Sequence, residues 1–335
     1  MAYITLNKNH FFNNLDIIAK LTCDKDKIAL VLKDNAYGHG ILEVAHMAKE
    51  YGIKKAVVQS NAEAEMIEEL FEYILVLADI PQVASPKIRY TINDIKAIKR
   101  FPKATKVELK VNSGMNRNGI GMNELDSAFA LIEKQGLKLE AVFTHHACAD
   151  ELDGIYELQK KNFEIVKLGF DKKTSDDSLR FHSCNSAALF RESSFDEDMV
   201  RVGIAAYGCL ELPFSSYATE LKPILSLYAQ KISSREINEG ESVGYGATFS
   251  ADKKMLVSNY DFGYGDGFLR ACSNFFHTKK GVKIAGRVSM DNSSFISDED
   301  ELLIFDDARD VASFANTISY EVLTSLKANI KRIII

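Results

Sequence analysis

Eight short β-rich runs alternate with amphipathic segments through the first two thirds of the chain. The runs cover residues 28–33, 54–60, 73–78, 88–92, 105–112, 139–146, 179–185 and 199–205. Apolar residues at helical spacing mark the intervening segments 41–51, 62–71, 125–135 and 155–168. Strand and helix that alternate eight times predict an α/β fold, the (β/α)8 TIM barrel, whose active sites lie at the carboxyl ends of the strands.

A second, mostly β domain is predicted after the barrel. The pattern of alternating strands and helices ends after Glu211, and Pro223 marks the end of a connector. Short alternating strands with glycine turns then dominate, and a helix is expected over residues 308–326. The expected strands cover residues 224–232, 255–262, 282–288, 293–296 and 302–305.

A chain of 335 residues exceeds the usual size of one domain. The predicted barrel domain spans residues 8–220. The β-rich C-terminal domain spans residues 221–335 together with residues 1–7, because the first strand, residues 3–6, is long enough to join it.

Composition excludes several classes of partner. The net charge of −6 disfavours binding to nucleic acid or to an anionic membrane surface. The five cysteines are odd in number and widely spaced, so we expect free thiols, no disulfide framework and no metal site. No secretory signal is recognisable, and no stretch approaches the roughly 18 apolar residues of a membrane span. We therefore expect a cytoplasmic protein.

One lysine stands at the carboxyl end of the first apolar run. Ile28 to Leu32 are followed by Lys33, and Gly38 and Gly40 come shortly after it. Burial of an unpaired ammonium is costly, so such a group tends to lose its proton or find a partner. A neutral amine is a nucleophile that can form a Schiff base with an aldehyde such as pyridoxal phosphate. On this segment alone, a lysine in a glycine loop is an equally good interpretation.

Polar residues also interrupt or end four other runs. They are Lys110, Asn112, His145, His146, Asn185, Ser186 and Arg201. Each one alone is more often a solvated loop residue. Because the carboxyl ends of barrel strands meet at one mouth, their joint occurrence favours a functional site there.

Several motifs, in order along nearly the whole chain, resemble those of the alanine racemase family. They are residues 31–40 (VLKDNAYGHG), 109–117 (LKVNSGMNR), 144–145 (TH), 185–188 (NSAA), 201–204 (RVGI), 243–248 (VGYGAT) and 290–291 (MD). The resemblance implies a pyridoxal-phosphate enzyme with a barrel and a β domain.

By this resemblance two bases act on the substrate. Lys33 holds the cofactor as a Schiff base and then serves as one base at the substrate α carbon, while Tyr245 serves as the other. His145 and Arg201 are expected to stabilise the tyrosine anion, because a phenol has a reference pKa near 10. Racemisation removes a proton from one face of a planar carbon and returns one to the other, so opposed bases suit it.

The resemblance also assigns the cofactor contacts. Arg201 faces the pyridine nitrogen, and because a guanidinium cannot accept a proton, that nitrogen stays largely unprotonated. The phosphate is bound by Ser186, Tyr37 and the backbone amides of Gly203 and Ile204.

Two cations are expected on the substrate side of the cofactor. Arg117 contacts the cofactor phenolic oxygen and the substrate carboxylate. Lys110 is the counterpart of a lysine that is often carbamylated in the family, where the resulting anion orients this arginine.

The second domain is expected to reach the active site of the other subunit, which implies a homodimer with shared sites. Met290 and Asp291 would line the substrate pocket and Tyr264 its inner gate. The outer channel would be formed by Asp150, Arg270 and Arg287. The substrate is a small amino acid, and the family supplies D-alanine for peptidoglycan.

One departure bears on substrate choice. The family carries a tyrosine near its C-terminus, and matching the sequence around Tyr320 places Ala328 at that position. We therefore expect a wider pocket and keep a broader-specificity racemase, serine being nearest in size, as an alternative. A decarboxylase of the same plan and a non-catalytic pyridoxal-phosphate homeostasis protein are further alternatives. Arg201 argues against the first, and the C-terminal domain with Tyr245 argues against the second.

Overall fold

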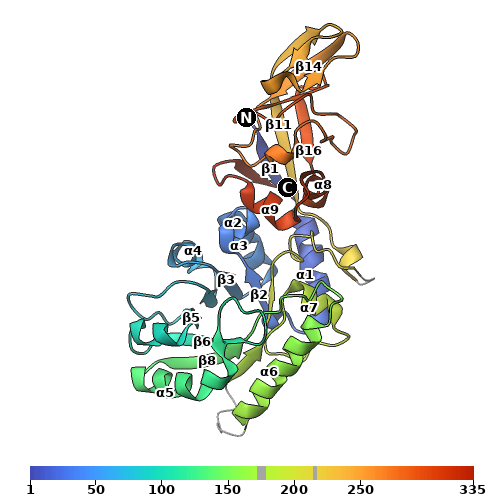
Figure 1. Ribbon diagram of the computed structural model, residues 1–335. Coiled ribbons are helices and arrows are strands. Elements are labelled where there is room, and N and C mark those ends of the chain that lie inside the picture. Colours follow the sequence, from blue (N-terminus) through green and yellow to red (C-terminus); the bar gives the residue numbers. More distant parts are fainter. Residues whose placement is uncertain (172–178, 214–216) are drawn as a thin grey trace.

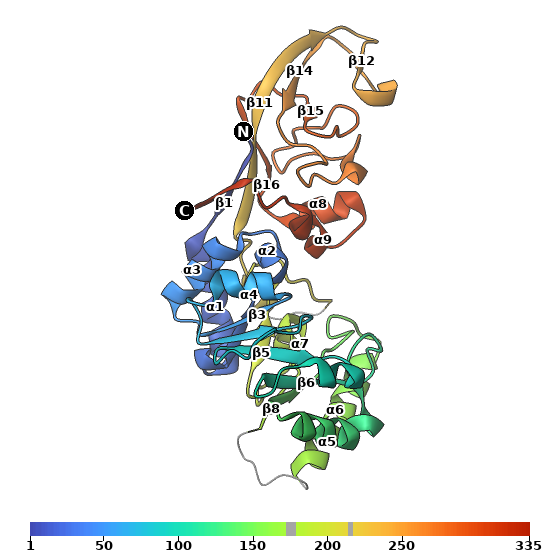
Figure 2. The ribbon, with the colours of Figure 1, turned by 90° about the vertical axis from the view of Figure 1, so that its left-hand side faces the viewer.

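A computed structural model describes residues 1–171, 179–213 and 217–335. A barrel of parallel strands forms one end of the molecule, and a β-rich domain extends from it (Figures 1 and 2). The helix α9 (Ser319–Ser325) of the second domain lies where the two parts meet.

Eight parallel strands form the barrel, as predicted. In chain order they are β2 (Ile28–Val31), β3 (Lys55–Val58), β4 (Tyr73–Val76), β5 (Ile88–Ile92), β6 (Lys106–Asn112), β8 (Lys138–Phe143), β9 (Arg180–His182) and β10 (Val200–Val202). They are hydrogen-bonded in the order β10-β2-β3-β4-β5-β6-β8-β9. A single parallel bridge between Asn185 and Arg201 links the two ends, so the barrel is nearly closed.

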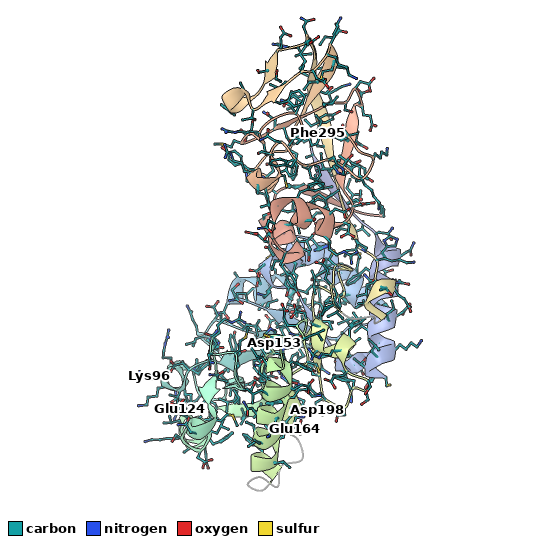
Figure 3. All side chains as sticks on the ribbon, turned by 45° about the vertical axis from the view of Figure 1, so that its right-hand side comes forward. Lys96, Glu124, Asp153, Glu164, Asp198 and Phe295 are labelled. Atoms are coloured by element: carbon teal, nitrogen blue, oxygen red, sulfur yellow. The ribbon has the colours of Figure 1, made fainter. Side chains whose placement is uncertain are left out.

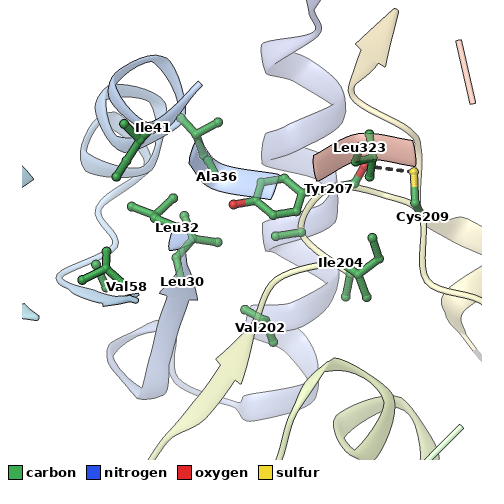
Figure 4. Close-up of a cluster of buried hydrophobic side chains, with 14 of the residues drawn as sticks. Leu30, Leu32, Ala36, Ile41, Val58, Val202, Ile204, Tyr207, Cys209 and Leu323 are labelled. Carbon is green, nitrogen blue, oxygen red and sulfur yellow. Dashed lines mark hydrogen bonds between the residues drawn. The ribbon is translucent and has the colours of Figure 1, made fainter. Parts of the chain in front are cut away.

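The strands read as continuous apolar runs because both of their faces are buried. Ala29, Val31 and Leu75 pack inside the barrel. Leu30 and Leu32 belong to the larger core shared with the surrounding helices (Figure 4). Those helices are α1 (Lys8–Thr22), α3 (Ile41–Tyr51), α4 (Asn61–Ile67), α5 (Leu125–Gln135), α6 (Ile155–Asp171) and α7 (Ser186–Arg191).

The chain leaves β2 through a left-handed turn, which forms most of α2 (Lys33–Tyr37). Residues 34–37 all have φ between 50° and 55° although none is glycine. A left-handed conformation costs L-residues about 1–2 kcal/mol each. The carboxylate of Glu63 on α4 offsets part of this cost by accepting the amides of Asp34 (2.7 Å) and Asn35 (3.4 Å).

The second domain is built on a six-stranded sheet. Its strands are β1 (Tyr3–Leu6), β11 (Leu225–Ile237), β14 (Met255–Tyr260), β15 (Ser293–Phe295), β16 (Glu301–Phe305) and β17 (Lys331–Ile334). As expected, β1 joins this sheet, where it pairs with β11 and β17. Phe295 lies in the core of the domain (Figure 3). The exact domain boundaries at residues 8 and 220 stay a prediction.

Two expectations for this domain are wrong. Residues 282–288 form no regular strand and contribute only isolated bridges at Lys283 and Ile284. The helix expected over 308–326 is interrupted, because Asn316 adopts a left-handed conformation (φ 53°) and ends α8 (Ala308–Ala315) before α9 begins. The sequence reading also missed β17.

Gly38 sets the contact between the two domains. Its φ is 75°, and a Cβ added here would lie 1.9 Å from the carbonyl oxygen of Leu323 on α9. Arg332 of β17 donates two hydrogen bonds to the Gly38 carbonyl (3.1 and 2.7 Å). Figure 4 shows Leu323 beside Tyr207 of the barrel core. Only glycine allows this approach.

In the described part of the chain, no helix combines the length and the apolar character needed to cross a membrane. The five cysteines are free thiols, as expected.

We expect Gly38→Ala to lower the free energy of unfolding by about 1–3 kcal/mol, because the methyl group meets backbone and the φ disfavours alanine. The thermal unfolding midpoint measures this change. The matched control is Gly169→Ala in α6, where an added Cβ meets nothing within 4 Å. There the helix should gain about 0.5–1 kcal/mol. Equal midpoints for the two variants would contradict the close packing at Gly38.

Candidate active site

A cavity of about 480 Å³ opens at the carboxyl ends of the barrel strands. Ten of the predicted site residues line it: Lys33, Tyr37, Lys110, Arg117, His145, Asp150, Ser186, Arg201, Gly203 and Ile204. The polar strand ends therefore come together as a barrel requires. A larger groove of about 870 Å³ between α5 and α6 is lined by none of the predicted residues.

Lys33 has a charge partner in the structure. Its side chain is 32% exposed, and its ammonium lies 3.2 Å from the carboxylate of Asp34. Of the two outcomes expected for this lysine, loss of the proton or a partner, the structure shows a partner, because the left-handed turn brings the next side chain back toward the lysine. The amine still faces the cavity, 5.9 Å from the centroid of the Tyr37 ring.

Arg201 is buried behind the cavity and donates in several directions. It binds the carbonyl oxygens of Thr144 (2.7 Å) and Ser183 (3.0 Å). It also contacts the Nδ1 atoms of two imidazoles, those of His182 and, at 3.5 Å, His145. Because a guanidinium has no acceptor, both Nδ1 atoms accept these bonds.

The protonation of His145 follows from this contact. Burial lowers its pKa well below the usual value, and the charges of Arg201, Lys110 and Arg117 lower it further. The ring is therefore neutral at physiological pH. With Nδ1 accepting from Arg201, the single ring proton lies on Nε2, which leaves one hydrogen-bond donor for a partner in the site.

Lys110 sits among other cations. Burial and the charges of Arg201, Arg117 and Lys33 lower its pKa to about 8. The loop that carries Arg117 is held by Asn112, whose side-chain oxygen accepts the amides of Gly114 (3.1 Å) and Asn116 (3.0 Å). The cations Lys110, Arg117, Arg201 and Lys33 together give the cavity an excess of positive charge, which suits anionic ligands.

The opposite wall offers small polar groups at close range. Ser186 accepts hydrogen bonds from the amides of Gly203 (3.1 Å) and Ala205 (3.4 Å). A Cβ at Gly203 would lie 3.0 Å from the Tyr37 ring, so glycine keeps this wall open. Burial, with the charge of Asp34, raises the pKa of Tyr37, so its hydroxyl stays protonated and can donate.

These features together fit pyridoxal phosphate. An amine, several cations, two hydroxyls and a glycine-lined wall match its aldehyde, its phosphate and the carboxylate of an amino acid.

The effect expected from Ala328 on substrate choice stays a prediction. Tyr320, at the start of α9, lines the cavity, and its ring centroid lies 5.6 Å from that of Tyr37. Ala328 is exposed and does not line the cavity. A tyrosine from the C-terminal segment therefore lines the cavity, although the family match places Ala328, not Tyr320, at the position of the family's tyrosine. The signal that could have found it is the short motif around Tyr320 itself.

The cavity also contains residues without an individual role in the sequence analysis, among them Met115 and Ile318, and the polar strand-end residues His146 and Asn185. His146 is buried, and its Nε2 lies 3.0 Å from the Ser183 hydroxyl.

Six predicted residues lie on the second domain and do not line this cavity: Tyr245, Tyr264, Arg270, Arg287, Met290 and Asp291. Tyr245, in the short helix η5 (Tyr245–Ala247), is 70% exposed. Arg287 lies beside it, since a Cβ on Gly246 would come within 2.9 Å of the guanidinium. Tyr264 and Met290 are also exposed. Backbone hydrogen bonds connect the two loops that carry them.

The fold and the cavity define a two-domain barrel enzyme whose active-site cavity is lined by a lysine, Lys33. Residues 6–211 match the family model described as the N-terminal domain of alanine racemase, and residues 224–334 match the model of its C-terminal domain. The chain belongs to the alanine racemase family and is an amino-acid racemase.

Relatives of similar length support this membership. The chain is 43% identical to the alanine racemase of Nitratiruptor sp., with 99% of each chain covered. It is 42% identical to that of Campylobacter curvus, again over 99% of each. The solved alanine racemase of Bacillus anthracis with bound L-Ala-P is 28% identical, with a TM-score of 0.87 over 100% of this chain and 95% of that one.

We expect Tyr320→Ala to raise the ratio of serine to alanine racemisation, because removal of the ring enlarges the cavity beside Tyr37. Racemisation assays with both substrates measure the ratio. Ala328→Tyr is the matched control and should leave the ratio unchanged, since this position is outside the cavity. A shift with Ala328→Tyr and none with Tyr320→Ala would reverse the assignment.

Proposed function

We propose that the protein interconverts L- and D-alanine with two bases from different subunits, Lys33 of one and Tyr245 of its partner. One observation carries the proposal. Lys33 lines the cavity with the other barrel residues, whereas Tyr245 is exposed on the second domain and outside that cavity. A second copy of the chain is the source from which such a tyrosine reaches the lysine, so the active unit is a homodimer.

The cofactor of the proposed reaction is pyridoxal phosphate, which when bound withdraws electrons from the substrate α carbon and so makes its proton removable. Lys33 holds it through its amine. Ser186, Tyr37 and the amides of Gly203 and Ile204 bind the phosphate. Arg201 faces the ring nitrogen and, lacking an acceptor, leaves it unprotonated.

The partner subunit's Tyr245 needs a stabilised anion to act as a base near neutral pH. His145 is suited to this role because its proton lies on Nε2 and its Nδ1 accepts from Arg201. The imidazole donates its hydrogen bond to the phenolic oxygen. Lys33 acts on the opposite face of the α carbon.

The substrate is held by charge and enclosed from both subunits. Arg117 binds its carboxylate with a planar fork of donors. The partner subunit's Met290 and the partner subunit's Asp291 line the pocket. The channel is formed by Asp150 and three residues of the partner subunit: the partner subunit's Tyr264, the partner subunit's Arg270 and the partner subunit's Arg287.

Alanine is the proposed substrate, and the ring of Tyr320 beside Tyr37 supports it because this ring narrows the cavity. A broader-specificity racemase stays the alternative that Ala328 suggests. The proposed biological role is supply of D-alanine for peptidoglycan in the cytoplasm. Arg201 weighs against a decarboxylase, which profits from a protonated ring nitrogen. The complete second domain weighs against a non-catalytic homeostasis protein.

Hybrid dimers test the shared site. We expect Lys33→Ala and Tyr245→Ala chains to be inactive alone and, after subunit exchange, to regain about a quarter of wild-type activity. In a twofold-symmetric dimer, half of the exchanged dimers are hybrids, and each hybrid has one intact site. Racemisation of L-alanine after mixing measures the recovery.

The matched control mixes Lys33→Ala with Arg201→Ala. Both residues lie in the barrel, so every hybrid site lacks one of them and activity should not return. Absence of recovery in the first mixture, with exchange verified by mass spectrometry, would exclude a shared site.

We further propose that Lys110 is carbamylated. The nitrogen of the neutral amine forms a bond to carbon dioxide and releases one proton to water, and the carbamate anion that results relieves the repulsion from Arg117 and Arg201. The depressed pKa of about 8 makes this amine more reactive than an ordinary lysine.

Labelling with ¹³C-bicarbonate should therefore give a carbamate NMR signal that rises as the pH increases through about 8, the value at which Lys110 loses its proton. Lys110→Ala should abolish the signal. The control is Lys106→Ala on the same strand, where the lysine pairs with Glu140 at 3.1 Å and the signal should persist. A signal that survives Lys110→Ala would contradict the assignment.

A further inference from the structure

A chain of polar side chains runs from the interior of the barrel to the cavity. It begins at Glu108 in β6, passes through His182 at the end of β9 and Arg201 in β10, and ends at His145 after β8. Glu108 and His182 are 0% exposed and Arg201 is 5% exposed. Burial of a charged or polar side chain is costly unless the group is fully paired. The presence of several such side chains in the barrel interior therefore needs a physical reason.

Glu108 is an ionised carboxylate with three donors. One oxygen accepts from Arg180 (3.0 Å) and from the hydroxyl of Tyr73, and the other accepts from Nε2 of His182 (3.0 Å). Burial alone would raise its pKa, but the hydrogen bond from His182 and the charge of Arg180 outweigh burial and hold the pKa of this carboxyl below its usual value. The group therefore only accepts hydrogen bonds.

The carboxylate of Glu108 accepts a hydrogen bond at Nε2 of His182 and so fixes the tautomer of this ring. Burial lowers the pKa of this ring, so it is neutral and carries one proton. With Nε2 donating to Glu108, Nδ1 holds a lone pair, and this lone pair accepts from Arg201. The opposite tautomer would set an N–H against the guanidinium, which has only donors.

Packing fixes the planes of both groups. The rings of Phe143 and His182 stack with centroids 4.8 Å apart and an interplanar angle of 8°. The guanidinium of Arg201 lies 5.0 Å from the centroid of the same phenyl ring. His182 therefore has little freedom to escape a poor hydrogen bond by rotation.

We propose that Glu108 is a positioning residue for racemisation: through the Nε2–H tautomer of His182 it orients Arg201, which in turn holds the proton of His145 on Nε2 at the cavity. Glu108 touches neither substrate nor cofactor in this scheme. The inference rests on the proposed roles of Arg201 and His145.

The matched pair of variants is Glu108→Gln and Glu140→Gln. Glu140 belongs to the same cluster, since its carboxylate contacts Arg180 (3.5 Å), Arg89 (2.8 Å) and Lys106 (3.1 Å), but it does not contact His182. A glutamine at position 108 offers one acceptor in place of two carboxylate oxygens and sets an amide N–H against either Arg180 or His182. Loss of charge near Arg180 is thus common to both variants, whereas loss of the tautomer constraint is specific to Glu108→Gln.

The first measurement reads the tautomer without cofactor or substrate. Long-range ¹H–¹⁵N NMR of the ¹⁵N-histidine-labelled apoprotein shows which ring nitrogen carries the proton, and His182→Gln assigns the signal. We expect the Nε2–H form in the wild type and in Glu140→Gln, and a mixed or Nδ1–H form in Glu108→Gln. A wild-type His182 with its proton on Nδ1, or with two protons, overturns the proposal even if Glu108→Gln does not fold.

The second measurement is kinetic. We expect kcat for alanine to fall about 10-fold to 100-fold in Glu108→Gln, as for other groups that orient a reacting side chain, with a smaller change in KM. Glu140→Gln should keep both values near those of the wild type. A folded Glu108→Gln protein with unchanged kcat overturns the proposal, as does an equal loss in Glu140→Gln. Failure of the proposed function is distinct from these outcomes, because the wild type would then not racemise alanine while its His182 tautomer remained as stated.

Discussion

A guanidinium buried behind the cavity determines the protonation of the groups around it. Arg201 can only donate, so each of its hydrogen-bond partners must accept: three backbone carbonyls and the Nδ1 atoms of His145 and His182. In both imidazoles the ring proton therefore lies on Nε2, the nitrogen that does not contact Arg201. One faces the buried carboxylate of Glu108, and the other belongs to the imidazole that lines the cavity. A carboxylate that only accepts and a guanidinium that only donates thus agree on the direction of the hydrogen bonds on both sides of His182.

The barrel makes this arrangement possible by bringing distant residues together. Arg201 and Glu108 lie on strands from opposite halves of the barrel sequence, yet both point into the same narrow interior. Parallel strands that are buried on both faces must be apolar, so each polar exception is conspicuous in the sequence. This is why the eight strands and the polar strand ends could be predicted. Glu108 lies close to the cavity because Lys110, two residues further along the same face of β6, already lines it.

Other features could not be predicted from the sequence, for local reasons. The pairing of Lys33 with Asp34 depends on a left-handed turn of non-glycine residues, which no propensity favours. The place of Tyr320 in the cavity wall depends on how α9 packs against the barrel, which a motif match along the sequence does not show. The break at Asn316 was missed because the apolar spacing continues from α8 into α9 across it. Residues 282–288 alternate as a strand does, but they make only isolated bridges.

The left-handed turn after Lys33 has a consequence for how the protein matures. Residues 34–37 hold their conformation through Glu63 on α4 and through Asn35, whose side chain accepts the amide of Ile41 at the start of α3 (2.9 Å). Both helices follow the lysine in the chain, so a ribosome must release them before the turn can form. Until then Lys33 is an ordinary solvated amine. The environment of the lysine that we propose to hold the cofactor is therefore completed late, only after the segments that fix the turn have been synthesised.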